Sequence, residues 1–436
     1  MLNSAAVAAL LDEHAITATA LTEIFLSAIN RLNRRLNCYV HVDHDGARAA
    51  AVASDQRRRQ GRSLGPFDGI AVAIKANIAV KGWPNSAGLA LRADEVADQD
   101  ATIIARLRAA GAVLLGATNM DEAALGASTN NAHFGACHNP LRTDYTTGGS
   151  SGGSACAIRS GLATVALGSD TMGSVRIPAS YCGVVGLKPT FDLLPMEGVV
   201  PLSARLDHLG FLVRDTRDLG TLLTGIAGVP DSDGPLPRRL GVLRLTDCVD
   251  LEPVVATGFE QALQRLAKAG CQLIELDGGS YDPALTRRAG FLLAERSLAD
   301  WLSAQGYKPA GLSPALFKMV DYGARQTDAK LVQARQCLDD MAFQAQRWLA
   351  HSDVVISPTT PQCAFPLDRR VPDSQADFTV IANLTGWPAV SIPVAVDGSV
   401  LPAGVHMMAP SGQDHVLARL AAVLQPIEPL ELPGGC

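Results

Sequence analysis

One stretch of the chain, Thr146–Pro189, constrains the fold more than any other: TTGGSSGGSACAIRSGLATVALGSDTMGSVRIPASYCGVVGLKP. It holds two glycine- and serine-rich clusters, Gly148–Ser154 and Gly168–Ser174. Flexible linkers share this composition, but here apolar runs such as Ala-Thr-Val-Ala-Leu separate the clusters. We therefore predict two packed loops whose glycines serve the shape of the backbone. Packed loops that expose serines and backbone N–H groups suit either anion binding or acyl transfer.

Predicted strands and helices alternate around this stretch. The first cluster precedes a helix predicted at 154–160, and the second follows a strand predicted at 164–167. Upstream, Phe67–Val80 is apolar on both faces and predicts one central strand, followed by a helix at 101–110 and a strand at 113–116. This rhythm indicates an α/β fold. Enzymes of that class place reactive loops where these two clusters lie.

The rest of the chain predicts more of the same elements and one large domain over 1–436. Residues 1–60 predict helices, one of them capped by Thr17 or Thr19 and another covering 45–60. Further strands are predicted at 241–245, 271–276, 353–357, 389–394 and 405–408, and further helices at 253–269, 283–304, 328–351 and 415–424. Pro230–Pro237 predicts a surface loop, and no linker is disordered enough to force a domain boundary.

Composition excludes several classes of function. The net charge of −6 creates no general attraction for nucleic acid. The nine cysteines have irregular spacing and no CxxC pair, which argues against a disulfide framework and a zinc site and favours a reducing, cytoplasmic compartment. The first residues predict a helix instead of a signal peptide. No apolar run is long enough to predict a membrane span.

Lys75 is the second unusual feature, because it lies inside the apolar run IAVAIKANIAV. No acidic residue occurs between Asp68 and Asp94, so no partner lies nearby in the sequence. Burial lowers the pKa of a lysine, and a neutral amine in a dry pocket acts as a general base. The alternative is that Lys75 extends to the end of its strand or pairs with a distant carboxylate. Its position alone favours neither.

Two other catalytic or binding motifs match poorly. Gly148–Gly152 fits G-x-S-x-G, but the strand–turn–helix context and the Asp and His downstream are poorly supported. Gly168–Ser174 has the spacing of a phosphate-binding loop, but Ser174 stands where that loop needs a lysine. A serine nucleophile requires a base, and no histidine lies within Thr146–Pro189. The residues alone therefore predict a Ser–Lys acyl-transfer enzyme.

At this point the chain resembles the amidase signature family. The resemblance rests on Lys75 in its apolar strand, GGSSGGSA at 148–155, GSDTMGSVRIPAS at 168–180 and CGVVGLKPT at 182–190. It extends over about 66–212 and resumes weakly at SPTTP and NLTGWPAVSIP, at 357–361 and 383–393. It implies one α/β/α domain with a mixed sheet covered by helices on both faces. In that domain 1–60 supplies helices, 66–212 the core, and 240–436 the remaining sheet and the pocket walls.

The resemblance also implies a Ser–cis-Ser–Lys triad. Ser174 would be the acylated nucleophile, Ser150 the bridging serine with a cis peptide bond to Gly149, and Lys75 the base. Backbone N–H groups would form the oxyanion hole, contributed by Thr171, Met172, Gly173 and Ser174. No metal or cofactor is implied.

Six further residues are expected to support the site or to order a loop beside it. Asp170 and Arg176 pair to hold the nucleophile loop, or Arg176 faces a substrate carboxylate. Ser154 bonds to the triad or caps its helix. Ser151 is a turn residue, Gly149 precedes the cis bond, and Asp207 orders a loop. Met172 departs from the glycine found in many family members, and its side chain is expected to narrow the acyl pocket.

The predicted function is therefore hydrolysis of a C–N bond in a small amide or ureide, through an acyl-enzyme, with release of ammonia or an amine. One alternative is the glutaminase subunit of a tRNA-dependent amidotransferase, which would act with partner chains and near nucleic acid. Another is a catalytically silent binding protein of the same fold. A small-molecule substrate, no membrane and a homodimer are expected for the first.

Overall fold

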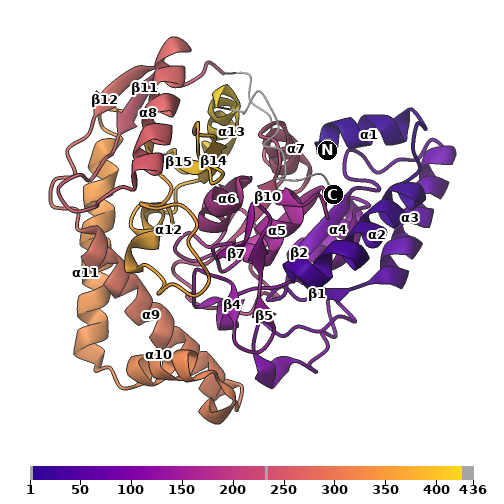
Figure 1. Cartoon of the computed structure of the whole chain (residues 1–436), viewed down its shortest axis with the longest axis horizontal. Coiled ribbons are helices and arrows are strands. Elements are labelled where there is room, and N and C mark those ends of the chain that lie inside the picture. The colour runs from indigo at the N-terminus through magenta and orange to yellow at the C-terminus, as the bar shows by residue number, and fades with distance from the viewer. Residues whose placement is uncertain (1–2, 231–233, 425–436) are drawn as a thin grey trace.

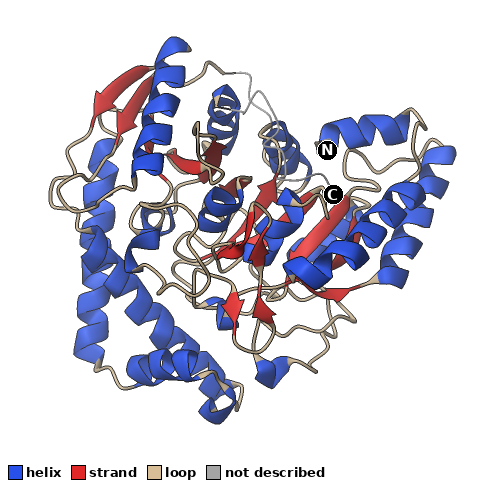
Figure 2. Cartoon of the chain, in the orientation of Figure 1, coloured by secondary structure: helices blue, strands red, loops and turns tan. Residues whose placement is uncertain are grey.

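A computed structural model of the chain describes residues 3–230 and 234–424 (Figure 1). One sheet of eleven strands runs through the molecule, and helices cover both of its faces (Figure 2). This confirms the predicted α/β class with a mixed sheet between layers of helices.

The strands predicted from 113 onward lie close to observed ones, and the structure adds others. Their bounds are β1 Tyr39–Val42, β2 Ala71–Lys75, β3 Val113–Thr118, β4 Asn130–Asn131, β5 Gly135–Ala136, β6 His138–Asn139, β7 Arg142–Thr146, β8 Val165–Asp170, β9 Val185–Lys188, β10 His208–Val213, β11 Arg239–Val242, β12 Gln272–Glu275, β13 Val354–Pro358, β14 Ala389–Val394 and β15 Ala403–Met408. The strands β4 and β5, and likewise β6 and β7, form two small separate sheets.

The chain forms thirteen α-helices within the described residues. They are α1 Ser4–Asp12, α2 Ala18–Leu36, α3 His44–Arg59, α4 Thr102–Ala109, α5 Gly152–Arg159, α6 Arg176–Cys182, α7 Arg217–Gly225, α8 Pro253–Lys268, α9 Pro283–Ala304, α10 Pro314–Ala324, α11 Asp328–Trp348, α12 Val380–Thr385 and α13 Asp414–Val423. The helices α5 and α6 pack together on the central strands, so both glycine–serine clusters adjoin the core.

The order of the large sheet joins the two halves of the chain. It runs β1-β3-β2-β8-β10-β9-β14-β15-β13-β11-β12. The strands β3, β2 and β8 are parallel, as are β13, β11 and β12, and the pairs between these groups are antiparallel. The two halves meet where β9 pairs with β14. The strands β2 and β8, which lead into Lys75 and the second cluster, are neighbours.

The single strand predicted over Phe67–Val80 is wrong in length. Only Ala71–Lys75 is a strand, although the flanking residues are also buried. A turn that includes Gly69, with φ of +84°, precedes the strand. A second turn, closed by a hydrogen bond from the Ile78 N–H to the Lys75 carbonyl, follows it. The apolar composition indicated that this segment is buried, but it did not indicate where the strand begins and ends. In the structure, the strand ends at Lys75.

Several elements escaped the sequence interpretation. The most central is β10, which lies between β8 and β9 and pairs with both. Its sequence, HLGFLV, is short and buried throughout, so it lacks the alternation of apolar and polar residues that indicates a strand. The predicted loop at 230–237 lies partly outside the described residues, and 234–237 forms neither helix nor strand. Eight cysteines are free in the described part of the chain, and Cys436 falls outside it.

The helices α10 and α11 both pack against α9 at one side of the molecule (Figure 1). The helix α9 also reaches the second cluster, because Gly290 lies against the sulfur of Met172. This group of helices therefore adjoins the site described below.

The structure assigns the helix cap that the sequence left open. Thr17 is the N-cap of α2, and its hydroxyl accepts a hydrogen bond from the Ala20 N–H at 3.0 Å. We predict that Thr17→Ala lowers the free energy of unfolding by about 1 kcal/mol, measured as a shift of the denaturant midpoint. Thr17→Ser keeps the acceptor and should unfold like the original chain. Equal midpoints for all three proteins would contradict the assignment.

Candidate active site

Lys75 ends β2 with its side chain fully buried. Its Nζ donates hydrogen bonds to Ser150 Oγ at 2.7 Å and to Ser169 Oγ at 2.8 Å. The carbonyl oxygen of Ser169 lies 3.3 Å from the same nitrogen. Lys75 therefore joins the sheet to the first cluster through Ser150 and to the second through Ser169.

Burial changes the acid–base behaviour of Lys75. Desolvation lowers the pKa of its amine from 10.5 to about 7, while the charges of Asp121, Asp170 and Asp207 act in the opposite direction. Removal from water favours the neutral form of a lysine. A substantial fraction of the amine is therefore neutral near pH 7, as a general base requires. The side chain is fully buried, which excludes the alternative that Lys75 extends from the end of its strand into solvent.

The first cluster is held tightly between β7 and α5. The peptide bond between Gly149 and Ser150 is cis, as the family resemblance implied. A Cβ atom on Gly149 would collide with the Asp121 carboxylate. Ser150 is fully buried. Glycine is therefore required before Ser150 so that Asp121 and the backbone near Ser128 can approach.

The second cluster forms the turn between β8 and α6. Ser174 lies in this turn, and its carbonyl oxygen accepts a hydrogen bond from the Ser151 N–H at 3.1 Å. The two clusters are therefore in direct contact. The Gly173 N–H donates to Asp170 Oδ1 at 2.7 Å. This N–H is therefore bonded to a carboxylate and is not free for the oxyanion role predicted for it. The same role for the N–H groups of Thr171, Met172 and Ser174 stays a prediction.

Asp170 and Arg176 form a fully buried, bidentate ion pair, with nitrogen–oxygen distances of 2.8 and 2.9 Å. Burial by itself raises the pKa of the Asp170 carboxyl, but the charge and hydrogen bonds of Arg176, with a bond from Asn383, hold it well below its usual range. Arg176 also donates to the Thr379 carbonyl at 2.7 Å and contacts His406 Nε2 at 2.9 Å. Its guanidinium is enclosed by protein and does not face a substrate.

The other predicted supporting residues bond to the protein framework. Ser154 Oγ contacts Thr118 Oγ1 at 2.8 Å and donates to the Leu167 carbonyl, so it neither caps α5 nor bonds to the triad directly. Ser151 Oγ donates to the Ser169 carbonyl at 3.1 Å. Asp207 accepts from Thr171 Oγ1 at 2.7 Å. It also accepts from two backbone N–H groups, those of Leu202 and Ser203.

The side chain of Met172 packs beneath α9. It belongs to a buried apolar cluster with Leu206, and its sulfur lies 2.7 Å from the position that a Cβ atom on Gly290 would take. This packing places it between the second cluster and α9. Its effect on the acyl pocket stays a prediction.

Sequence reasoning missed three residues that hold the two clusters in place, one of them inside the second cluster. Ser169 receives hydrogen bonds from Lys75 and from Asn77 Nδ2 at 3.0 Å. Thr379 lies just before α12 and Asn383 lies within it. Both form hydrogen bonds to the second cluster, which is more than 200 residues away in the sequence. Ser169 lies inside the GSD segment and Asn383 begins NLTGWPAVSIP, so both stood in quoted motifs. Thr379 had no such signal.

A cavity near these loops has a volume of about 870 Å³. Its wall includes Asp121 and Ser128, which adjoin the first cluster through Gly149 and through a hydrogen bond from Thr146 Oγ1 to the Ser128 carbonyl. Across from them, α9 and α10 contribute apolar and basic side chains, namely Phe291, Leu316, Met319, Arg287 and Arg288. Arg287 is paired with Asp377. A small organic molecule fits such a space.

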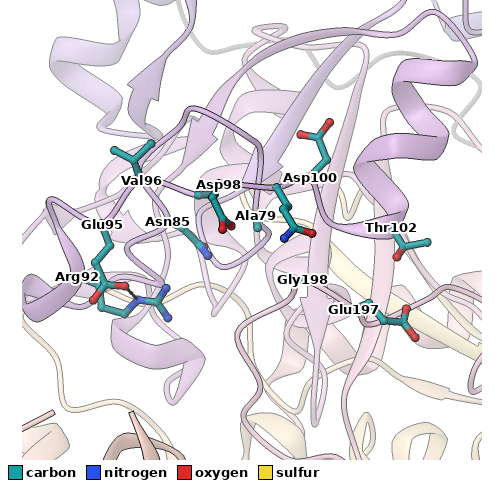
Figure 3. Close-up of a pocket in the computed structure, with 12 residues that line it drawn as sticks. Ala79, Asn85, Arg92, Glu95, Val96, Asp98, Asp100, Thr102, Glu197 and Gly198 are labelled. Carbon is teal, nitrogen blue, oxygen red and sulfur yellow. Dashed lines mark ion pairs between the residues drawn. The ribbon is translucent and has the colours of Figure 1, made fainter. Parts of the chain in front are cut away.

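A second cavity, of about 490 Å³, lies elsewhere on the molecule (Figure 3). Its wall carries Glu95, Asp98, Asp100 and Glu197, with an ion pair between Arg92 and Glu95 at 2.9 Å. None of Lys75, Ser150 and Ser174 lines either cavity, but the wall of the larger one includes Asp121 and Ser128, which lie against Gly149 of the first cluster. On this ground the larger cavity is the candidate for the substrate.

Over 3–230 and 234–424, no group of three or more His, Cys, Asp or Glu side chains is placed to hold a metal ion. Across the same ranges, no helix combines the length and the apolar character needed to cross a membrane.

Comparison with known proteins agrees with this fold. The sequence profile of the family described as Amidase matches residues 20–418. A glutamyl-tRNA(Gln) amidotransferase subunit of Salinispora arenicola is 34% identical over 97% of this chain and 96% of its own length. A crystal structure of an amidase superposes with a TM-score of 0.89 at 29% identity, covering 97% of this chain and 99% of that one. The corresponding amidotransferase subunit from Thermotoga maritima superposes with a TM-score of 0.78 at 26% identity, covering 96% and 95%.

An α/β sheet with two glycine–serine loops around a buried lysine defines a hydrolase that acts on carbon–nitrogen bonds of amides. The chain belongs to the amidase family.

The buried amine makes stability depend on pH in a way that can be measured. The folded pKa of Lys75 is about 7 and lies below the value of 10.5 for an exposed lysine. Between these values the unfolded chain binds more protons, so this group makes the folded state gain stability as pH rises. We predict that the original chain gains thermal stability relative to Lys75→Met between pH 7 and 10.

The control for this measurement is Lys81→Met, at an exposed lysine. Its melting temperature should follow the original chain across the same range. If Lys75→Met also runs parallel to the original chain, the amine is charged in the folded state.

Proposed function

We propose that the chain hydrolyses a small amide or ureide through a triad of Lys75, Ser150 and Ser174. The observation that carries this proposal is the 2.7 Å hydrogen bond from the Lys75 amine to Ser150 Oγ. It joins a base whose pKa is lowered by burial to about 7 with the serine next to the nucleophile loop.

In the proposed reaction, the neutral amine of Lys75 accepts the proton of Ser150 while Ser150 accepts that of Ser174. The Ser174 oxygen attacks the amide carbonyl carbon. Backbone N–H groups of Thr171, Met172 and Ser174 stabilise the oxyanion, each donor lowering the barrier by about 2.7–4 kcal/mol. The proton then passes through Ser150 to the leaving nitrogen, which departs as ammonia or an amine. Water repeats the sequence on the acyl-enzyme and releases the acid.

The support for a hydrolase that acts alone is structural. The amidase crystal structure superposes with a TM-score of 0.89, against 0.78 for the amidotransferase subunit. The cavity of about 870 Å³ suits a small molecule. A cytoplasmic location and a homodimer belong to this proposal.

A second candidate function is the glutaminase subunit of an amidotransferase. It is favoured by the 34% identity to the Salinispora arenicola protein over nearly the whole of both chains. A subunit of this kind would need partner chains and a charged tRNA. A catalytically silent binding protein is the third candidate, and the joint presence of Lys75, Ser150 and Ser174 argues against it.

We predict that replacing any one of Lys75, Ser150 and Ser174 by alanine lowers kcat for amide hydrolysis on the order of 10⁴-fold or more, because the three act as a unit. A fluorophosphonate should label the original chain at Ser174, and Ser174→Ala should not be labelled. Circular dichroism establishes that each variant is folded. Ammonia release by folded Ser174→Ala at the original rate would refute the triad.

The substrate is tested by measuring ammonia release from a panel of aliphatic amides, aryl amides, ureides and glutamine. We predict turnover of an amide or ureide by the purified chain without other proteins. If only glutamine is turned over, and ammonia passes to charged tRNA when partner chains co-purify, the amidotransferase function is correct instead. A labelled Ser174 without any turnover would leave the silent alternative refuted and the substrate outside the panel.

A further inference from the structure

The helix α12 holds the nucleophile loop from the distant C-terminal part of the chain. Thr379 Oγ1 donates a hydrogen bond to the Met172 carbonyl at 2.6 Å. One turn further on, Asn383 Nδ2 donates to the carbonyl of Asp170 at 2.9 Å. All four residues are buried. Residues four apart in a helix lie on one side of it, so both side chains act on the same loop.

The bond from Thr379 fixes one particular peptide group. The carbonyl of Met172 and the N–H of Gly173 belong to the same planar peptide. Thr379 binds the carbonyl, and Asp170 Oδ1 binds the N–H at 2.7 Å. A planar group held at both ends keeps its orientation. Because the flanking peptides share its Cα atoms, the directions of the Met172 and Ser174 N–H groups become restricted.

Gly173 shows how closely Thr379 approaches. Its φ is +126°, a conformation that side chains disfavour, and a Cβ atom there would collide with Thr379 Oγ1. The contact therefore requires glycine at 173 and a small hydroxyl side chain at 379.

The hydroxyl of Thr379 does not form a hydrogen bond within its own helix. It occupies the N-cap position of α12, where threonine is a favoured residue, but its side chain makes no capping hydrogen bond. The hydroxyl is directed to the nucleophile loop instead. If Thr379 served only to stabilise α12, its hydroxyl would accept a hydrogen bond from a backbone N–H of the first turn of that helix.

We propose that Thr379 is a positioning residue for the oxyanion site, whose hydroxyl orients the Met172–Gly173 peptide so that the Met172 and Ser174 N–H groups face the developing charge. The inference rests on the proposed function. Loss of the bond acts on the transition state rather than on substrate binding, because the oxyanion forms only during the reaction.

The test replaces Thr379 by valine, which has nearly the same shape and no hydroxyl. We expect kcat for the amide found in the panel to fall on the order of 10- to 100-fold, the scale of a small misplacement of catalytic groups, with KM within about twofold. Thr379→Ser keeps the donor and should recover most of kcat. The pH at which activity is half-maximal should not move, because Lys75 is unaffected.

The matched control is Thr385→Val on the same helix. The Thr385 hydroxyl donates to the Ile381 carbonyl at 2.8 Å, a bond within α12 that leaves the loop alone. Its kcat should stay at the original value. Should Thr379→Val fail to fold, Thr379→Ala, with less bulk, replaces it in the same assay.

The inference is overturned if Thr379→Val turns over substrate at the original rate, or if Thr379→Ser is as slow as Thr379→Val. A fall in kcat equal to that of Thr385→Val would also overturn it, because the effect would then come from the helix. Failure of the triad itself is recognised separately, since Ser174 of the original chain would then escape the fluorophosphonate.

Discussion

The hydrogen bond from the Lys75 amine to Ser150 is the interaction on which the site depends. It requires the lysine to be removed from water, which the end of a central strand between two covered faces achieves. Desolvation lowers the pKa of the amine to about 7 and makes it a base at neutral pH. The same burial destabilises the folded state below about pH 10. The removal from water that makes Lys75 a base at neutral pH therefore lowers the stability of the protein.

A second buried cluster supports the first and ties the two halves of the chain together. The Asp170–Arg176 pair lies beneath the nucleophile loop and bonds to Asn383, to the Thr379 carbonyl and to His406 of β15. Removing one partner of a buried ion pair leaves an uncompensated charge. The loop that carries Ser174 therefore depends on residues more than 200 positions away.

Much of the fold was predictable, because long amphipathic or apolar segments indicate their type. The helix at 283–304 agrees in both ends with α9, and the strand at 389–394 with β14. Strand ends were harder: Phe67–Val80 is buried throughout, and only backbone turns show that the strand covers Ala71–Lys75. The short strand β10 has no alternation because it is buried on both faces. Pairing with distant neighbours decides such elements.

The family, the α/β class and the three residues proposed as the triad could all be predicted from the sequence, because the order of its glycines, serines and one lysine carries that information locally. The sequence left open whether Arg176 faced substrate, how Ser154 was bonded and which N–H groups of the loop were free. Tertiary structure decided these points by enclosing Arg176, directing Ser154 to Thr118 and binding the Gly173 N–H to Asp170. It also brought Thr379 to the loop, since hydrogen bonds between remote segments exist only after the sheet has joined them.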